Sequence, residues 1–130
     1  MLSWIDWTGW RTLTTATIKR APEYAGVYHI ALVNGVVDYK WGPSQTVYYG
    51  MGYIWDRLYK HHRGRGSKVL AKLLDSGVPL QVRWGPSDDP RGHECSLIGE
   101  FVDDFGERPL GNINGCRIST LLDRVEDDDY

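Results

Sequence analysis

Residues 26–33 read GVYHIALV and residues 46–51 read TVYYGM. Both stretches are rich in residue types that favour β-strands, namely valine, isoleucine and tyrosine. Asn34-Gly35 directly follows the first stretch and is a strong signal for a tight hairpin turn. We therefore expect a strand over residues 26–33 that returns over residues 36–41, a turn at Gly42-Pro43-Ser44, and a further strand over residues 46–51.

The hydrophobic pattern becomes helical after this strand. Residues 53–63 read YIWDRLYKHHR and place apolar residues at helical spacing. Ser67 can cap a second helix over residues 68–75. Residues 93–105 carry apolar residues with the spacing of a third helix, which we expect to be the longest.

The remaining stretches complete the expected architecture. Residues 80–84 alternate as a strand, and the threonine-rich residues 13–18 have the composition of an extended segment. The order of strands and helices predicts an α+β fold with a small, mostly antiparallel sheet of three to four strands flanked by helices.

The chain has the length of one domain. We interpret its 130 residues as a single domain with a core over about residues 24–116, an N-terminal extension over residues 1–23 and a solvated acidic tail over residues 123–130. The extension holds tryptophans at three-residue spacing, Trp4, Trp7 and Trp10. Such a set more often seals a small core than stacks on nucleic-acid bases.

Composition favours a cytoplasmic protein without a membrane segment. The hydrophobic fraction is 42% and the charged fraction 25%, which is ordinary for a globular domain. No apolar run is long enough to cross a membrane, and the N-terminus lacks the pattern of a secretory signal. Cys95 and Cys116 have no CxxC spacing and are too few for a disulfide framework, which favours a reducing compartment.

The formal net charge of −2 hides an uneven distribution of charge. The segment from Arg57 to Lys72 contains many basic residues and no carboxylate, and the acidic residues collect after it. Phosphate groups are normally contacted by lysine and arginine, so this segment predicts one basic face on the molecule.

Two triplets resemble the signature of the GIY-YIG nuclease superfamily. Gly26-Val27-Tyr28 and Tyr48-Tyr49-Gly50 each stand on an expected strand, with valine for isoleucine in the first triplet and tyrosine for isoleucine in the second. The helix that follows carries Arg57 and, four residues on, His61, as in one restriction-enzyme branch of the family.

The downstream sequence extends the resemblance. Residues 94–101 read ECSLIGEF, similar to the family's helix that opens with a glutamate, and Asn112 follows shortly after a proline. The loose match here leaves open whether Asn112 or Asn114 is the site asparagine. The chain departs from the family's pattern in two ways. Tyr28 and Tyr48 are 20 positions apart, which is long for the family, and the chain has no obvious appended DNA-binding domain.

The resemblance implies a metal-dependent DNA endonuclease. Phosphodiester hydrolysis needs an activated water and a cation on the non-bridging oxygens. Mg²⁺ keeps several waters and needs few protein ligands, so Glu94 is expected to anchor Mg²⁺ or Mn²⁺. Arg57 is expected to grip a phosphate bidentately. The alternative interpretations are a helix N-terminal acid for Glu94 and a solvent-exposed arginine for Arg57.

The resemblance also assigns the remaining catalytic roles. Tyr28 would act as general base, and His61 would relieve it of its proton or hold a phosphate. Tyr48 would orient the water or the phosphate, and Asn112 would hydrogen-bond near the metal. Tyr49, on the other strand face, is expected to pack in the core. Core packing for the strand tyrosines and a solvated surface imidazole for His61 are the alternatives.

The basic segment would then position DNA without reading its sequence. The residues expected to contact DNA are Lys60, His62, Arg63, Arg65, Lys68 and Lys72. A solvated basic helix end is the alternative interpretation.

We therefore expect a small stand-alone endonuclease, with any sequence specificity supplied by a homodimer or a partner protein. Two alternatives stay open. A type II-like restriction endonuclease is favoured by the pair Arg57 and His61, although 130 residues hardly accommodate recognition insertions. A catalytically inert nucleic-acid-binding module on the same fold is disfavoured because four residues are retained together, namely Tyr28, Tyr48, Arg57 and Glu94.

Overall fold

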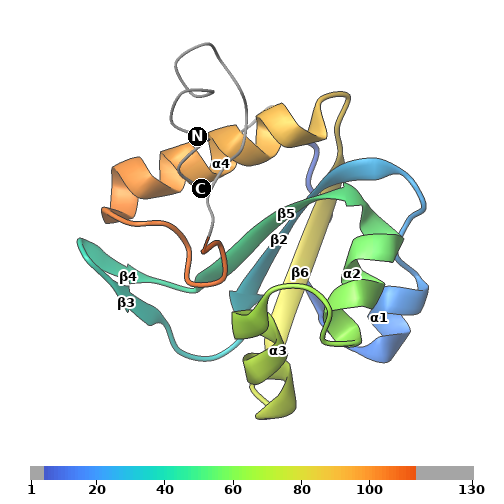
Figure 1. Cartoon of the computed structure of the whole chain (residues 1–130), viewed down its shortest axis with the longest axis horizontal. Helices are drawn as coiled ribbons and strands as arrows, with labels where there is room; N and C mark the ends of the chain where they lie inside the picture. Colours follow the sequence, from blue (N-terminus) through green and yellow to red (C-terminus); the bar gives the residue numbers. More distant parts are fainter. Residues whose placement is uncertain (1–4, 114–130) are drawn as a thin grey trace.

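The computed structural model describes residues 5–113 (Figure 1). In chain order the elements are β1 (Arg11–Thr12), α1 (Thr15–Lys19), β2 (Ala25–Leu32), β3 (Val37–Tyr39), β4 (Gly42–Ser44), β5 (Thr46–Tyr53), α2 (Ile54–His62), α3 (Lys68–Asp75), β6 (Leu80–Pro86) and α4 (Pro90–Phe105). The predicted α+β class with a mostly antiparallel sheet is confirmed. The predictions for Trp4, Asn114, Cys116 and the acidic tail lie outside the described residues.

An antiparallel sheet forms the centre of the fold. Its strand order is β1-β6-β2-β5, so β2 is an inner strand and β5 lies at an edge. Tyr28 in the middle of β2 stands opposite Gly50 of β5 on one side and Trp84 of β6 on the other. This pairing places the first tyrosine of the sequence motifs at the centre of the sheet.

Helices cover both faces of the sheet (Figure 1). One core cluster joins α1, α2 and α3 to the face that carries Tyr28, Ile30 and Val47. A second cluster joins α4 and β3 to the other face, around Val27 and Tyr49. Tyr28 and Tyr48 therefore share the face of α2, whereas Tyr49 lies on the face of α4, as alternation along a strand predicts.

The expected return of the chain alongside β2 is wrong. Gly35 does adopt a left-handed turn conformation, with φ 82°. However, both sides of β2 are taken by β5 and β6, so β3 pairs instead with β4 in a separate two-stranded sheet. The expected turn at Gly42-Pro43-Ser44 is therefore a strand. Tyr39 fastens this small sheet by donating a hydrogen bond of 2.6 Å to the carbonyl of Thr46.

The expected extended segment over residues 13–18 is also wrong. Only Arg11–Thr12 pairs in the sheet, and the short helix α1 follows. The Thr14 hydroxyl accepts a hydrogen bond of 3.2 Å from the amide of Thr17, so threonine acts here as a helix cap. Burial of Ile18 then fixes the helix against the core.

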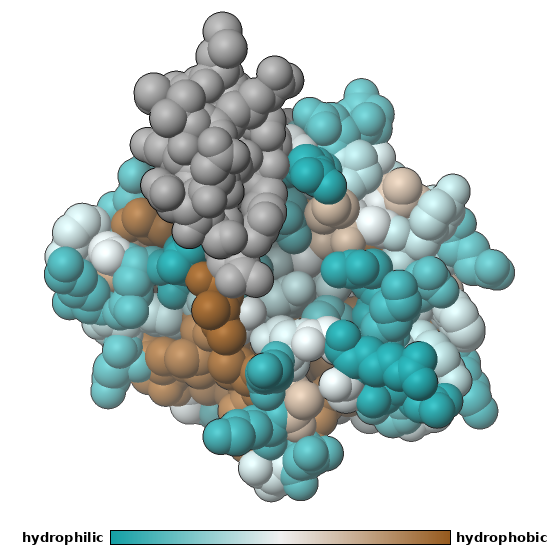
Figure 2. Space-filling view, in the orientation of Figure 1, coloured by the Kyte–Doolittle hydropathy of each residue, from teal (hydrophilic) through white to brown (hydrophobic). Residues whose placement is uncertain are grey.

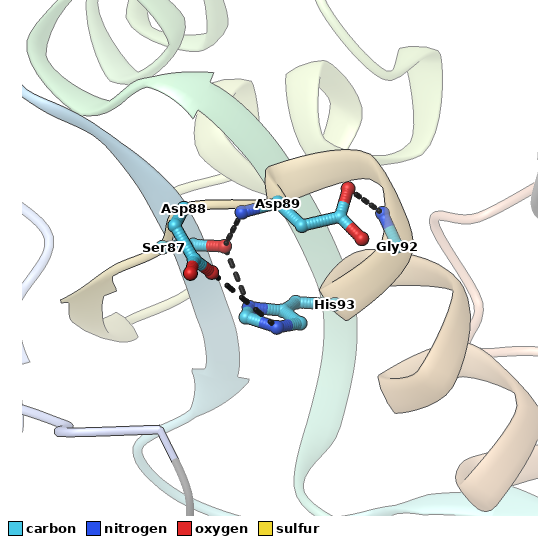
Figure 3. A network of polar contacts seen from close by, with 5 residues as sticks. All are labelled: Ser87, Asp88, Asp89, Gly92 and His93. Carbon is cyan, nitrogen blue, oxygen red and sulfur yellow. Dashed lines mark hydrogen bonds and ion pairs between the residues drawn. The ribbon is translucent and has the colours of Figure 1, made fainter.

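The starts of α3 and α4 also follow from their caps. The helix predicted over residues 68–75 is confirmed, and the hydroxyl of Ser67 accepts the amide of Leu70 at 3.3 Å. Helix α4 begins at Pro90, before the predicted residue 93, because Asp89 accepts the amide of Gly92 at 3.2 Å and proline suits a first helical position. Figure 3 shows this start, where Ser87 also hydrogen-bonds His93 at 2.6 Å.

Within residues 5–113, no helix combines the length and the apolar character needed to cross a bilayer. Cys95 on α4 is disulfide-bonded. The cysteine count therefore carries no argument for a reducing compartment, and the cytoplasmic location stays a prediction.

The fit of Tyr28 against Gly50 can be tested by adding one methyl group. A Cβ at position 50 would collide with the Tyr28 ring, so we expect Gly50→Ala to lower the free energy of unfolding by about 1–3 kcal/mol in urea denaturation. Gly99→Ala on α4 is the control, since nothing lies within 4 Å of its added Cβ and helix propensity should raise stability by about 0.5–1 kcal/mol. Equal stability of the two variants would show that the ring is not held against position 50.

Candidate active site

A cavity of about 560 Å³ opens between β5, α2, α3 and the start of α4. The residues that line it are Tyr48, Arg57, His61, Arg65, Gly66, Ser67, Lys68, Glu94, Gly111, Asn112 and Ile113. All of the catalytic residues predicted from the sequence except Tyr28 are among them. The chain thus brings together, in one cavity, side chains that are widely separated in the sequence.

Tyr28 lies behind the cavity wall rather than on it. Its side chain is fully buried, and its hydroxyl shares a hydrogen bond of 2.6 Å with Nε2 of His61. His61, itself 3% exposed, does line the cavity. The ring of Tyr48 packs against both, with centroid distances of 6.0 Å to Tyr28 and 5.1 Å to His61. Tyr28 is therefore connected to the cavity through His61 and Tyr48.

Burial keeps this hydrogen-bonded pair uncharged. Desolvation raises the pKa of Tyr28 well above its usual 10.0, and the positive charge of Arg57 offsets this only in part. Desolvation, with a smaller contribution from Arg57, lowers the pKa of His61 to about 4. A neutral phenol and a neutral imidazole therefore face each other at pH 7. Arg57 reduces the cost of a Tyr28 phenolate, as expected, but by less than burial increases it.

One nitrogen of His61 has no partner among the described residues. Nδ1 is buried and forms no hydrogen bond within residues 5–113. A side chain at position 66 would collide with this nitrogen, so the imidazole ring of His61 fits here only because Gly66 has no Cβ. This buried nitrogen is therefore a polar atom without a hydrogen-bond partner among the described residues.

Arg57 is the cation that acts on four titratable groups in and behind the cavity. Its charge lowers the pKa of Tyr28, Tyr48, His61 and Glu94. Its aliphatic stem lies over Gly52, where an added Cβ would stand 3.1 Å from Cγ. Arg57 is exposed to solvent, as the alternative interpretation required, yet it also lines the cavity. Its guanidinium is thus accessible to an anion that enters the cavity.

Glu94 is the carboxylate of the cavity. Desolvation raises its pKa to about 7, although the charges of Arg57 and Arg91 oppose the shift. Neither arginine forms an ion pair with it within the described chain. Helix α4 begins at Pro90 and has no acidic residue in its first turn, so a favourable helix dipole does not explain Glu94.

The donor set suits a hard divalent cation with few protein ligands. Residues 5–113 contain no group of three or more His, Cys, Asp or Glu side chains that could hold a metal ion. A single desolvated carboxylate in a polar cavity is nevertheless sufficient for Mg²⁺, which retains most of its waters. A bound cation would also offset the desolvation that raises the pKa of Glu94. Glu94 therefore fits the predicted role of metal anchor.

Asn112 lines the cavity while its amide group holds β5. Its Oδ1 accepts the amide of Tyr49 at 2.9 Å, and its Nδ2 donates to the carbonyl of Tyr49 at 2.7 Å. Asn112 is 8% exposed. Its contact with a metal or a phosphate stays a prediction, and the structure adds a second role, in which it fixes the strand that carries Tyr48.

The predicted DNA-contacting residues are spread over three cavities and the exposed surface of α3. Arg65 and Lys68 line the main cavity, and Lys60 and Arg63 line a neighbouring cavity that also includes Arg65. His62 lies beside a further hollow next to Asp75, and Lys72 is exposed on α3 outside these cavities. Hydrophilic residues gather over α2 and the loop that follows it (Figure 2). The basic segment is therefore continuous with the rim of the cavity.

Trp7 and Trp10 form a cluster away from this cavity. Arg83 lies between Trp7 and Trp10, with its guanidinium carbon 4.4 Å and 4.8 Å from their ring centroids. Arg83 also donates to Nδ1 of the buried His29 at 3.1 Å. Trp7 packs against the second core cluster, as expected, whereas Trp10 is 41% exposed.

Sequence reasoning missed the small residues that shape the site. Gly52, Gly66 and Gly111 each leave room for a side chain of the cavity, namely Arg57, His61 and Tyr48. The clustering of glycines beside the predicted catalytic residues was the available signal. Comparisons with protein-family models, curated proteins and solved structures found no match to this chain.

The raised pKa of Glu94 predicts that the free energy of unfolding decreases as the pH rises. Between its usual 4.5 and its folded-state value of about 7, the folded protein binds a proton that the unfolded chain has released, so rising pH lowers the free energy of unfolding. We expect Glu94→Gln to be more stable than wild type at pH 8 by on the order of 1–3 kcal/mol, with the difference vanishing near pH 4. Thermal unfolding in EDTA across this range measures the effect.

Asp103→Asn provides the matched control on the same helix, since Asp103 is exposed. This variant should follow the wild-type pH profile. If the stability of Glu94→Gln also followed the pH dependence of the wild type, Glu94 would not be desolvated. Mg²⁺ should raise the melting temperature of the wild type at pH 8 and leave that of Glu94→Gln unchanged.

Proposed function

We propose that this protein is a small metal-dependent DNA endonuclease that hydrolyses phosphodiester bonds, with a domain of the GIY-YIG type. The observation that carries the proposal is the juxtaposition, in one cavity, of the desolvated carboxylate of Glu94 with the cations Arg57, Arg65 and Lys68. A carboxylate for a metal and a cationic wall for a phosphate are the two requirements of phosphodiester cleavage.

In this proposal Glu94 anchors Mg²⁺ or Mn²⁺. A divalent cation bound there supplies positive charge to the non-bridging oxygens of the scissile phosphate. Because the pKa of Glu94 is about 7, protons compete with the cation below that pH. Cleavage is therefore expected to rise with pH through the neutral range.

The cationic side chains bind and orient the phosphate. Arg57 lies at the cavity with its stem held over Gly52, which reduces the freedom that a bidentate contact would remove. Arg65 and Lys68 also line the cavity, and Lys68 is the first residue of α3. These contacts are sequence-independent, so specificity for a site would come from a second copy or a partner protein.

Tyr28 and His61 are proposed to move the proton of the attacking water. Both are uncharged at pH 7, and their 2.6 Å hydrogen bond connects the buried Tyr28 hydroxyl to the cavity through His61, so that the pair can take up the proton of the water together. The negative charge of a phosphate beside His61 raises the pKa of the imidazole and favours this transfer. Tyr48 lines the cavity beside them and is proposed to orient the water or the phosphate.

The first test separates binding from chemistry at Glu94. Wild-type protein is expected to nick plasmid DNA in Mg²⁺ and not in EDTA, and Glu94→Gln should abolish cleavage because it removes the metal anchor. DNA affinity measured in EDTA should be nearly unchanged. Binding of plasmid without cleavage by the wild type would instead favour the inert nucleic-acid-binding module, and near wild-type cleavage by Glu94→Gln would remove the assignment.

The second test concerns the Tyr28 hydroxyl. Tyr28→Phe removes the hydrogen bond to the buried His61, so we expect a stability loss of about 1–3 kcal/mol. Single-turnover cleavage should fall on the order of 10² to 10⁴-fold if the hydroxyl takes part in proton transfer. Tyr49→Phe on the opposite face of β5 should cleave at close to the wild-type rate. A cleavage rate for Tyr28→Phe equal to that of the wild type would contradict the proton-transfer role.

A further inference from the structure

A second cavity of about 400 Å³ lies on the outer side of α2. It is lined by Trp55, Asp56, Tyr59, Lys60, Arg63 and Arg65. Its volume falls within the range of about 300–1,000 Å³ that is common for small-ligand sites. Arg65 lines this cavity and the candidate active site alike, so the two are neighbours along the molecular surface.

A stacked aromatic pair lines part of this second cavity. The rings of Trp55 and Tyr59 are nearly parallel, at 6°, with their centroids 5.1 Å apart. This is an offset stack, which leaves part of each ring face uncovered. Trp55 packs partly against the core, and Tyr59 is 38% exposed. The pair is therefore a rigid aromatic surface that solvent can reach.

Cations surround the aromatic pair. Arg63 donates from Nη1 to the Tyr59 hydroxyl at 2.7 Å, and its guanidinium carbon lies over the Tyr59 ring, 5.6 Å from the centroid. Lys60 and Arg65 complete the basic lining, and Asp56 is the one carboxylate among the lining residues. Three cations and one anion give the cavity a net charge of +2 (3 − 1). Aromatic faces bordered by cations are the features that bind single-stranded nucleic acid.

We infer that this cavity binds an unpaired nucleotide of single-stranded DNA. Its base stacks on Trp55 and Tyr59, and its phosphates contact Lys60, Arg63 and Arg65. A base within a duplex presents only its edges, so an intact double helix cannot use the aromatic surface. The inference rests on the proposed nuclease function and narrows its substrate to DNA with an unpaired segment next to the cleaved bond.

The wild-type protein can report stacking directly. A short oligothymidylate with one 2-aminopurine base is added in EDTA, and stacking of that base on an aromatic surface quenches its fluorescence. We expect quenching with wild type, and we expect Tyr59→Ala to lose it and to weaken the Kd of the oligonucleotide about five- to one-hundredfold. The slope of log Kd against log salt concentration should stay as in wild type, because the substitution removes a ring and no charge.

Two variants control for the loss of an aromatic ring. Tyr59→Phe keeps the ring and should restore both quenching and affinity to within about twofold of wild type. Trp41→Ala removes a 63% exposed aromatic side chain next to β4 and should leave both unchanged. Retained quenching in Tyr59→Ala, or equal losses of affinity for the oligonucleotide and for a duplex of the same length, would overturn the inference.

Plasmid cleavage by wild type in Mg²⁺, measured in parallel, separates the two proposals. Cleavage without 2-aminopurine quenching overturns the nucleotide site and leaves the nuclease proposal standing. Quenching without cleavage supports the nucleotide site and counts against the nuclease. Because the quenching assay uses wild-type protein, it decides the inference even if Tyr59→Ala fails to fold.

Discussion

The buried hydrogen bond between Tyr28 and His61 is the constraint on which the candidate site depends. It joins the inner strand β2 to helix α2 at 2.6 Å. Breaking it would leave a polar atom buried without a partner, which is costly. The missing side chains at Gly50 and Gly66 give the two rings their space. With α2 fixed at this point, Arg57 one turn earlier is held at the cavity.

Two effects set the charge of the site, and their balance changes with depth. Desolvation and the charge of Arg57 oppose each other at Tyr28 and Glu94, whereas both lower the pKa of His61. Desolvation dominates at Tyr28 and His61, which stay neutral. At the half-buried Glu94 it leaves the pKa at about 7, so this carboxylate responds to protons or a cation in the neutral range. The uncharged groups are therefore deep, and the charged ones border the solvent.

Helices and strands with a clear hydrophobic periodicity could be predicted from the sequence. Elements that depend on residues far away in the sequence could not. The helix over residues 68–75 and the opposite faces of Tyr48 and Tyr49 follow from local spacing. The pairing of β3 with β4 depends on which strands occupy the sides of β2, and the helix at α1 depends on a single cap at Thr14. Grouping of Glu94 with Arg57 was predictable only through a family resemblance. The full burial of Tyr28 and the use of the Asn112 amide are tertiary effects without a local signal.

Asn112 also has a consequence for association between molecules. Strand β5 lies at an edge of the sheet, where unpaired backbone groups can recruit a strand from another chain. The Asn112 side chain occupies both backbone groups of Tyr49, and the amide of Gly111 donates to the carbonyl of Val47 at 2.8 Å. Gly111 and Asn112 together form the hydrogen bonds that a neighbouring strand would form in the middle of this edge. Intermolecular sheet extension is therefore blocked along the strand that carries Tyr48, a residue that lines the cavity.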